Sequence, residues 1–399
     1  MLTVGGKPRR VGERIRVAML HGPGRPDADG VSDYVANLAR ALDDVDVTVT
    51  PVPVRPDGRA GWRAATADAA RTVRRLGPDL VHVQFAPAAY RFSGHPGLLP
   101  LRLPRDVPLV TTVHEYGWWA SPGWLPGPLW SLVERTRLWD RETGRLVPAS
   151  AAVVVTNDGH RTLVAARTGR GPVRIPIAPN IGDEVGAATA GRRLRADLGL
   201  PEGAPLLAFF GFVHPVKGLR HLIEALPDLR RSHPDLRLLV VGGFTSQALP
   251  EPEARAFRAE LDALAARVGV TDAVAFTGHV PAERVSAALH AADVVVLPFT
   301  AGASTKSGAL LAALAHGVPT AVTLPDDDTE LRGSGAVAVI GARRDSDAIV
   351  RAVGRLLTDP VLRRRLAERG RAFASAYSWP RVAAAHRDLY ARTLERAGA

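Results

Sequence analysis

A lysine and two glycines in the second half of the chain have the types and spacing of an anion-binding site. An apolar run at residues 206–210 ends at Gly211, and Lys217 follows in a polar loop, just before Gly218 and a helical apolar pattern. A glycine lets a ligand approach the backbone closely, and a neighbouring lysine supplies positive charge. This spacing predicts an anionic ligand. An ordinary strand-turn-helix unit with a surface lysine is the alternative.

Histidines and aromatic residues gather in the first half of the chain. His82 and His114 lie in DLVHVQF and PLVTTVHEY, which we interpret as strands whose carboxyl ends carry the two imidazoles toward a ligand. Trp118, Trp119 and Trp124 follow in a loop rich in glycine and proline, where they could stack on a sugar or another flat acceptor. Alternatively, the histidines are buried, hydrogen-bonded structural residues, and the tryptophans pack under the long loop.

Two further loops lead into helices. Asp29-Gly30 is a turn pair after the first apolar run, and Ser32 or Asp33 is the expected helix cap. In the second half, a glycine loop precedes a helix expected over residues 304–316. Phosphates and sugar hydroxyls bind well at helix N-termini because the first backbone amides have no partner within the helix. Plain strand-to-helix turns fit these loops equally well.

Parallel sheets are needed to position these residues. Strand and helix patterns alternate along both halves of the chain, and residues 204–242 have the pattern of one strand-helix-strand unit. The apolar periodicity lapses after residues 177–183, which marks a linker. With 399 residues, the chain is expected to form domains over residues 1–185 and 186–378, followed by a helix over residues 379–399.

The composition is that of a soluble globular protein, with 46% hydrophobic and 23% charged residues. The absence of cysteine excludes disulfides, thiolate metal sites and a cysteine nucleophile. No apolar stretch is long enough for a signal-peptide core or a membrane span, so we expect a cytoplasmic protein. The formal net charge is +11, but the arginines are scattered, so we expect no nucleic-acid partner. Weak association with an anionic membrane surface stays open.

The order of these features resembles the family-4 retaining glycosyltransferases of the GT-B fold. The resemblance covers nearly the whole chain and is carried by DGVSDYVANLARAL, IAPNIGD, FFGFVHPVKGLRHLIEAL, LLVVGG, FTGHVPAERVSAALHAADVVVLPF, LLAALAHGVPTAV and SWPRV. It implies an α/β fold with two Rossmann-like domains whose parallel sheets face each other across a cleft. It also implies an acceptor in the first domain, a nucleotide-sugar in the second, and a final helix that crosses back to the first.

Site residues can be carried over position by position. The resemblance implies that Lys217 stabilises the donor diphosphate as it leaves, and that His114 lies beside the transferred sugar. It implies donor contacts at Gly30, Gly211, Phe212, Gly278, Val280, Ser304, Thr305, Lys306 and Ser307. We predict acceptor contacts at His82, Tyr116, Trp118 and Trp119. Members of this fold usually need neither a metal nor a cofactor, so the acidic run at residues 326–328 is expected to be a solvated loop.

Two departures from the family pattern stand out. The family has Gly-Arg where this chain has Gly211-Phe212, and the positions of its Glu-x7-Glu motif are Ser304 and Ala312 here. We infer that Lys306, expected in the first turn of its helix, replaces the missing arginine. A lysine that points to solvent is the alternative.

The predicted function is transfer of a sugar from a nucleotide-diphospho-sugar to a small-molecule, glycan or lipid-linked acceptor, with retention and without metal. A homodimer is left open. One alternative is a homologue that binds a sugar nucleotide or a partner enzyme without transfer, which the lost motif residues favour and the retained Lys217 disfavours. Another is a nucleotide-sugar epimerase, which needs acid and base residues that the motifs barely provide.

Overall fold

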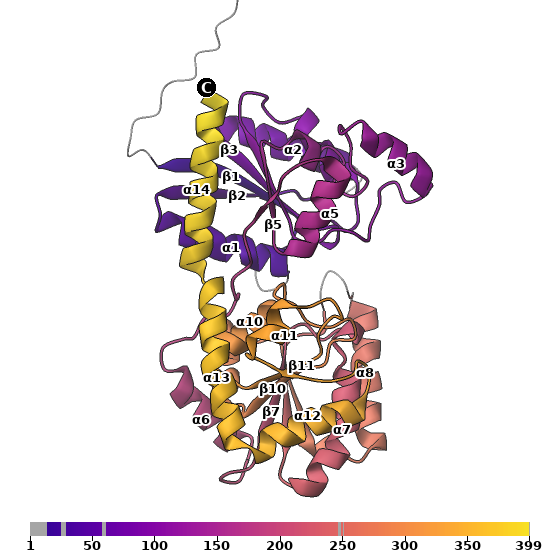
Figure 1. Ribbon diagram of the computed structural model, residues 1–399, viewed down its shortest axis with the longest axis vertical. Coiled ribbons are helices and arrows are strands. Elements are labelled where there is room, and N and C mark those ends of the chain that lie inside the picture. The colour runs from indigo at the N-terminus through magenta and orange to yellow at the C-terminus, as the bar shows by residue number, and fades with distance from the viewer. Residues whose placement is uncertain (1–13, 25–28, 58–60, 246–248, 250, 399) are drawn as a thin grey trace, which may run out of the picture. The chain divides into compact units, whose positions relative to one another are not determined.

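The computed structural model describes residues 14–24, 29–57, 61–245, 249 and 251–398. The chain forms two compact units, which are described separately (Figure 1). The first comprises Met1–Ile177 and Trp379–Ala399, and the second comprises Ala178–Ser378. The last helix therefore groups with the first unit, and the first division falls a few residues before the predicted boundary at residue 185.

The first unit is built around a six-stranded parallel sheet with the order β2-β1-β3-β4-β5-β6. Its strands are β1 (Ile15–His21), β2 (Val47–Pro53), β3 (Leu80–Phe85), β4 (Leu109–Val113), β5 (Ala152–Val155) and β6 (Val173–Arg174). Its helices are α1 (Gly30–Asp43), α2 (Gly61–Leu76), α3 (Gly127–Arg135), α4 (Leu146–Ala149), α5 (Asp158–Thr168) and α14 (Trp379–Gly398). β3 and β4 are buried at every residue, because helices cover both faces of a parallel sheet.

The second unit repeats this plan with the order β12-β11-β10-β7-β8-β9. Its strands are β7 (Leu206–Phe210), β8 (Arg237–Val241), β9 (Val274–Gly278), β10 (Val294–Leu297), β11 (Thr320–Val322) and β12 (Ala338–Val339). Its helices are α6 (Ala187–Asp197), α7 (Leu219–Ser232), α8 (Glu251–Arg267), α9 (Ala282–Ala291), α10 (Gly308–Ala315), α11 (Glu330–Ser334), α12 (Ser346–Thr358) and α13 (Pro360–Ala374). The prediction of two α/β units with parallel sheets is confirmed.

Each sheet has one place where the strand order reverses. In the first unit the chain leaves β1 for β2 on one side and later returns to β3 on the other. In the second unit β7 lies between β8 and β10 in the same way. Ligands of open α/β sheets bind beyond the carboxyl ends of the strands at such a switch point. The loops that follow β7 and β10 therefore define where a ligand of the second unit is expected.

No helix in the described part of the chain has both the length and the apolar character that crossing a membrane requires.

Candidate active site

The switch point of the second unit brings Lys217 against an aromatic ring. Lys217 ends a short 3₁₀ turn (Pro215–Lys217) after β7, and its Nζ lies 3.9 Å from the ring centroid of Phe299, which follows β10. The backbone amide of Thr300 donates to the carbonyl of Val216 over 2.9 Å, so the two loops are joined directly. The ammonium is thus held by a cation-π contact at the edge of the sheet where an anion is expected.

Three neighbouring strands end in glycines with positive φ. Gly211 follows β7 with φ +125°, Gly242 follows β8 with φ +141°, and Gly278 ends β9 with φ +67°. A Cβ on Gly242 would lie 2.2 Å from the carbonyl oxygen of Gly211, so a side chain does not fit there. A Cβ on Gly278 would meet no atom within 4 Å, so its surroundings are open. Gly242 was not among the predicted donor contacts.

Gly211 also lies next to the start of α10. A Cβ at Gly211 would be 3.6 Å from the Cβ of Ala309, the second residue of that helix. Nearby, Gly218 has φ +71°, and a Cβ there would overlap the carbonyl oxygen of Pro298 at 1.9 Å. The two loops therefore meet backbone to backbone. The structure brings Gly211, Lys217 and the N-terminus of α10 to one edge of the sheet.

The start of α10 differs from the prediction. The helix begins at Gly308, and Ser307 caps it by accepting a hydrogen bond from the amide of Leu310 over 3.3 Å. Lys306 therefore precedes the cap, and the expectation that it lies in the first turn is wrong. The reason is local, because Ser307 has an extended backbone with φ −86° and ψ 105°. Lys306 is exposed, and its amide lies 3.5 Å from the hydroxyl of Ser304.

A carboxylate that the sequence analysis missed holds this segment. Buried Thr305 donates its hydroxyl to Oε2 of Glu330 over 3.3 Å, and the hydroxyl of Tyr377 donates to the other carboxylate oxygen. Phe212 and Val280, the remaining predicted donor contacts of the second unit, are partly buried. In the acidic run at residues 326–328, Asp326 pairs with Arg343 over 2.7 Å at an exposed position. That run is thus partly engaged with the protein.

His82 lies inside the first unit and does not end its strand. It is the third residue of β3, is fully buried, and has both ring nitrogens hydrogen-bonded. Nδ1 lies 2.7 Å from the hydroxyl of Tyr390 on α14, and Nε2 lies 2.7 Å from the hydroxyl of Thr112 on β4. The expectation that His82 points from a strand end is wrong, because β3 continues to Phe85. Its position matches the structural alternative.

His114 directly follows β4, as predicted, and is positioned by a residue that the sequence analysis missed. Its Nε2 lies 2.8 Å from Oε1 of Gln84, so this nitrogen donates and Nδ1 carries the free lone pair. The Tyr34 ring meets the imidazole edge-on at 4.9 Å. Burial lowers the pKa of His114 to about 3, with smaller contributions from His160 and His386. The ring is neutral at pH 7 and can accept a hydrogen bond, but it supplies no positive charge.

Gly30 is the first residue of α1, and a Cβ there would meet nothing within 4 Å. The helix cap is Asp29, whose carboxylate accepts from the amide of Ser32 over 3.0 Å and from its hydroxyl over 2.8 Å. The predicted caps, Ser32 and Asp33, are therefore wrong by a few positions. Asp29 takes that role because its backbone is extended, with φ −154°.

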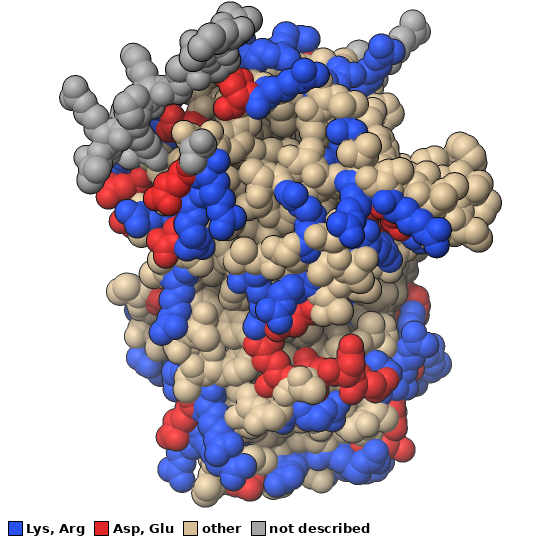
Figure 2. Space-filling view, turned by 45° about the horizontal axis from the view of Figure 1, so that its top comes forward, with Lys and Arg blue, Asp and Glu red and all other residues tan. Residues whose placement is uncertain are grey.

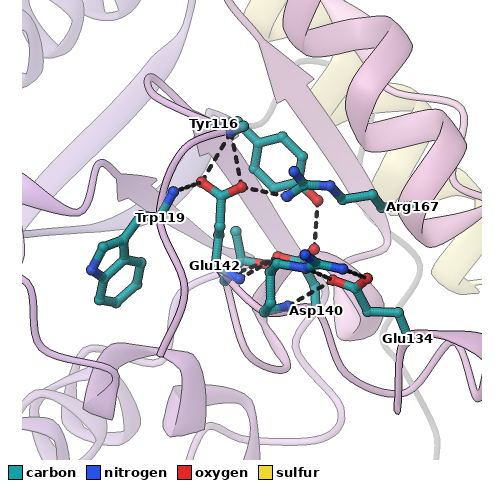
Figure 3. A network of polar contacts seen from close by, with 9 residues as sticks. Tyr116, Trp119, Glu134, Asp140, Glu142 and Arg167 are labelled. Carbon is teal, nitrogen blue, oxygen red and sulfur yellow. Dashed lines mark hydrogen bonds and ion pairs between the residues drawn. The ribbon is translucent and has the colours of Figure 1, made fainter. Parts of the chain in front are cut away.

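The tryptophan loop after His114 is anchored by buried carboxylates, shown in Figure 3. Glu142 accepts from the backbone amides of Gly117, over 2.8 and 3.0 Å, and Trp119, over 3.3 Å, and also pairs with Arg167. Asp140 accepts from the hydroxyl of Tyr116 over 2.5 Å. The Arg167 guanidinium lies 5.0 Å from the centroid of the Tyr116 ring. Tyr116 is therefore a buried anchor, with its hydroxyl already engaged.

The outer side of this loop exposes large apolar side chains. Trp118 is 60% exposed and Trp124 is 79% exposed. Leu129, Leu132 and Leu138 are also exposed, on α3 and just after it. Figure 2 shows a mostly uncharged projection at its right edge, where Figure 1 places α3, with basic side chains at its base. Over residues 117–138 the one acidic residue, Glu134, is buried and paired with Arg141.

The chain matches two sequence families along its length. Residues 9–180 match a family described as Glycosyl transferase 4-like domain, and residues 192–373 match Glycosyl transferases group 1. A D-inositol 3-phosphate glycosyltransferase of Nocardia farcinica (strain IFM 10152) is 30% identical, over 82% of this chain and 70% of the relative.

Two solved structures show the same fold. Sucrose-phosphate synthase from Thermosynechococcus elongatus superposes with a TM-score of 0.72 at 21% identity, over 96% of this chain and 100% of its own. Anabaena HepE in complex with UDP and glucose superposes with a TM-score of 0.69 at 16% identity, over 95% of this chain and 100% of its own. The chain belongs to the group 1 glycosyltransferases and has their GT-B fold.

Proposed function

We propose that the chain transfers a sugar from a nucleoside-diphosphate sugar to an acceptor hydroxyl, with retention of the anomeric configuration and without a metal in the transfer step. The observation that carries this proposal is the position of Lys217 at the switch point of the second unit, 3.9 Å from the Phe299 ring and in the loop that abuts α10. A fixed cation beside a helix N-terminus suits a diphosphate. The second unit is therefore the proposed donor site.

The chemistry asks the protein to stabilise a leaving group. When the bond between the sugar and the diphosphate breaks, negative charge grows on the diphosphate oxygens. Lys217 and the first amides of α10 would oppose that charge without moving, which is how preorganised electrostatics lowers a barrier. Lys306, one residue before the helix cap, is the proposed second cation. The glycine-ended strands at Gly211 and Gly278 leave room for the nucleotide.

His114 has a narrower role in this proposal than a charged histidine would have. Nε2 of His114 carries the proton and donates it to Oε1 of Gln84, and burial keeps the ring neutral. His114 would then accept a hydrogen bond from a sugar hydroxyl through Nδ1. Gly30, at the start of α1, would approach the sugar or phosphate through its backbone.

We propose a lipid-linked acceptor, met at a membrane surface by the first unit. The supporting observation is the exposed apolar set at Trp118, Trp124, Leu129, Leu132 and Leu138, with no exposed carboxylate over residues 117–138. Tryptophan and leucine beside arginine are typical of segments that bind at a membrane interface. Sedimentation with vesicles containing an anionic lipid should retain the wild type, whereas Trp124→Ser with Leu132→Ser should lower the bound fraction. Equal retention of both proteins would mean that these side chains do not carry the binding, and no retention of the wild type would leave a soluble acceptor.

The first experiment is a thermal-shift panel in EDTA with UDP, GDP, ADP and dTDP, each alone and as its common sugar conjugates. One nucleotide series should raise the melting temperature, because a ligand that binds only the folded state stabilises it. The shift should be lost in Lys217→Ala and kept in Arg343→Ala, which removes an exposed surface pair. No shift with any nucleotide would overturn the donor assignment. Once the donor is known, NMR of the product's anomeric proton tests retention.

A further inference from the structure

Three potential metal ligands converge in the second unit, away from the proposed donor site. The side chains of Asp183, His290 and His316 place one donor atom each within 4.8 Å of the others. They come from separate segments: Asp183 precedes α6, His290 lies in the last turn of α9, and His316 directly follows α10. Three such donors brought together by the fold are the usual set for a divalent transition metal.

His316 is oriented as metal-binding histidines are. Its Nδ1 lies 2.7 Å from the backbone carbonyl of Ala312, so this nitrogen carries the proton and donates it. Nε2 is left with its lone pair, 2.8 Å from the hydroxyl of Ser286. Donation from one ring nitrogen to a backbone carbonyl fixes the tautomer and makes the other nitrogen a better ligand. The ring is nearly fully buried, so this orientation is held firmly.

His290 and Asp183 complete the set from the more open side. His290 Nε2 lies 2.6 Å from Oδ1 of Asp183, and the rings of His290 and His316 are 5.3 Å apart. His290 follows Ser286 by one helical turn on α9, so both face His316. The side chain of Asp183 is 52% exposed, which gives a metal a path from solvent.

We propose that Asp183, His290 and His316 bind one zinc ion, or a similar late first-row divalent cation, with water or the Ser286 hydroxyl in the fourth position. Two imidazoles favour such an ion over magnesium or calcium, which prefer oxygen ligands. In a tetrahedral site with ligand bonds of about 2.0–2.2 Å the donor atoms lie roughly 3.4 Å apart. Asp183 and His290 must therefore separate from their 2.6 Å contact, whereas donors up to 4.8 Å apart must draw closer, and the exposed Asp183 can supply this movement. The ion would take the Nε2 lone pair of His316 in place of the hydrogen bond from Ser286.

This site is separate from sugar transfer. His316 lies at the opposite end of α10 from the proposed donor loop, and a helix of 8 residues spans about 12 Å. Zinc bound there would join the segment before α6 to α9 and α10. Its expected effect is therefore to stabilise the second unit.

The test is a zinc titration of the full-length protein after treatment with EDTA, read by calorimetry and by competition with a chromophoric chelator. One zinc per chain should bind, and saturating zinc should raise the melting temperature by about 5 °C, since binding to the folded state alone is stabilising. Cobalt should give the visible absorption of a tetrahedral complex. Asp183→Asn, His290→Gln and His316→Gln should each weaken zinc binding by at least about 10-fold.

The matched control is His221→Gln. His221 forms a similar pair with Glu224, Nδ1 to Oε2 over 3.0 Å. Among the described residues, no third potential metal ligand joins this pair. Its loss should leave the affinity unchanged. Asp183→Asn alters an exposed side chain, so its circular dichroism in EDTA should match the wild type. Absence of stoichiometric zinc binding, or binding unchanged in both Asp183→Asn and His290→Gln, would overturn the proposal and leave an ordinary ion pair.

Discussion

The Nδ1 of His82 lies 2.7 Å from the hydroxyl of Tyr390, although the two residues are 308 positions apart in the chain. His82 is in β3 at the centre of the first sheet, and Tyr390 is on α14. Both side chains are fully buried. The final helix is thus part of the polar core that also contains Gln84, the residue that orients His114.

Replacement of Tyr390 by phenylalanine should loosen the first unit. The change leaves Nδ1 of His82 buried without this partner, at an expected cost of about 1–3 kcal/mol. Hydrogen exchange followed by mass spectrometry should show faster exchange in α14 and β3. Thr393→Val on the same helix is the control, because the Thr393 hydroxyl donates only to the Leu389 carbonyl within the helix. Equal effects of the two substitutions would show that the contact with His82 contributes little.

Acid should destabilise the first unit below about pH 6.5. Burial lowers the pKa of His82 well below its usual value, that of His114 to about 3 and that of His386 to about 4. Below pH 6.5 these three histidines bind protons in the unfolded chain but stay neutral in the folded chain. The free energy of unfolding is therefore retained above pH 6.5 and falls toward pH 4. The expected slope is about 1.4 kcal/mol per pH unit for each histidine.

The variant that tests this slope is His386→Leu. Nε2 of His386 has no hydrogen-bond partner among the described residues, so an apolar replacement should cost little at pH 7.5. Urea unfolding at pH 7.5, 6.0 and 5.0 should give a shallower loss of stability in the variant than in the wild type. If the free energy of unfolding fell equally with pH in both proteins, His386 would not be a neutral buried group in the folded state.

Gly218 and Gly278 should tolerate alanine very differently, although both have positive φ. A Cβ at Gly218 meets the Pro298 carbonyl oxygen at 1.9 Å, whereas one at Gly278 meets open space. Gly278→Ala should cost about 1–2 kcal/mol from backbone strain alone. Gly218→Ala should cost more and should displace Lys217, which also weakens nucleotide binding. Urea unfolding and the nucleotide thermal shift measure the two effects, and similar losses would contradict the close backbone approach.

Lys217 and Lys306 should affect turnover to different extents. Lys217→Ala should lower kcat by about 10²–10³-fold, the usual cost of removing one fixed group that stabilises developing negative charge. Lys217→Arg should recover part of the rate. Lys306→Ala should mainly raise KM for the donor, because Lys306 lies outside the helix and is exposed. Unchanged KM in Lys306→Ala would remove Lys306 from the donor site.

Glu142→Gln should free the tryptophan loop. Glu142 is buried, and its loss leaves the Arg167 guanidinium without its charged partner, at an expected cost of up to about 3–5 kcal/mol. Amides in residues 117–144 should exchange faster, and KM for the acceptor should rise. Asp158→Asn is the control, since Asp158 is 52% exposed where it pairs with Arg161 and Arg174, so each pair should contribute less than about 1 kcal/mol. Slow exchange in Glu142→Gln would show that Asp140 alone anchors the loop.

The strands and the glycine turns were predictable, because apolar runs and glycines are local signals. Gly211 and His114 follow their strands as the sequence predicts. The capping of α10 was harder, since Ser304 and Ser307 are both good caps and only the backbone geometry selects Ser307. The role of His82 was out of reach for a different reason. Its partner Tyr390 is 308 positions away, and periodicity says nothing about which distant side chains meet.

The carboxylates of the tryptophan loop show the same limit. Glu142 accepts from amides 23 and 25 positions earlier and pairs with an arginine 25 positions later. Nothing in RETGR indicates those partners. A polar residue inside a buried strand, such as Gln84 in LVHVQF, was the one available signal for the network around His114.

The return of the chain to the first unit also sets the order in which the protein can be completed during synthesis. Ala178–Ser378 is continuous, so all of the second unit is synthesised before α14 is made. The first unit emerges earlier but lacks Tyr390 and His386 until the last helix arrives. Domains fold as units when their sequence is complete. The sequence of the second unit is therefore complete before that of the first unit, although the sheet of the first unit is made earlier.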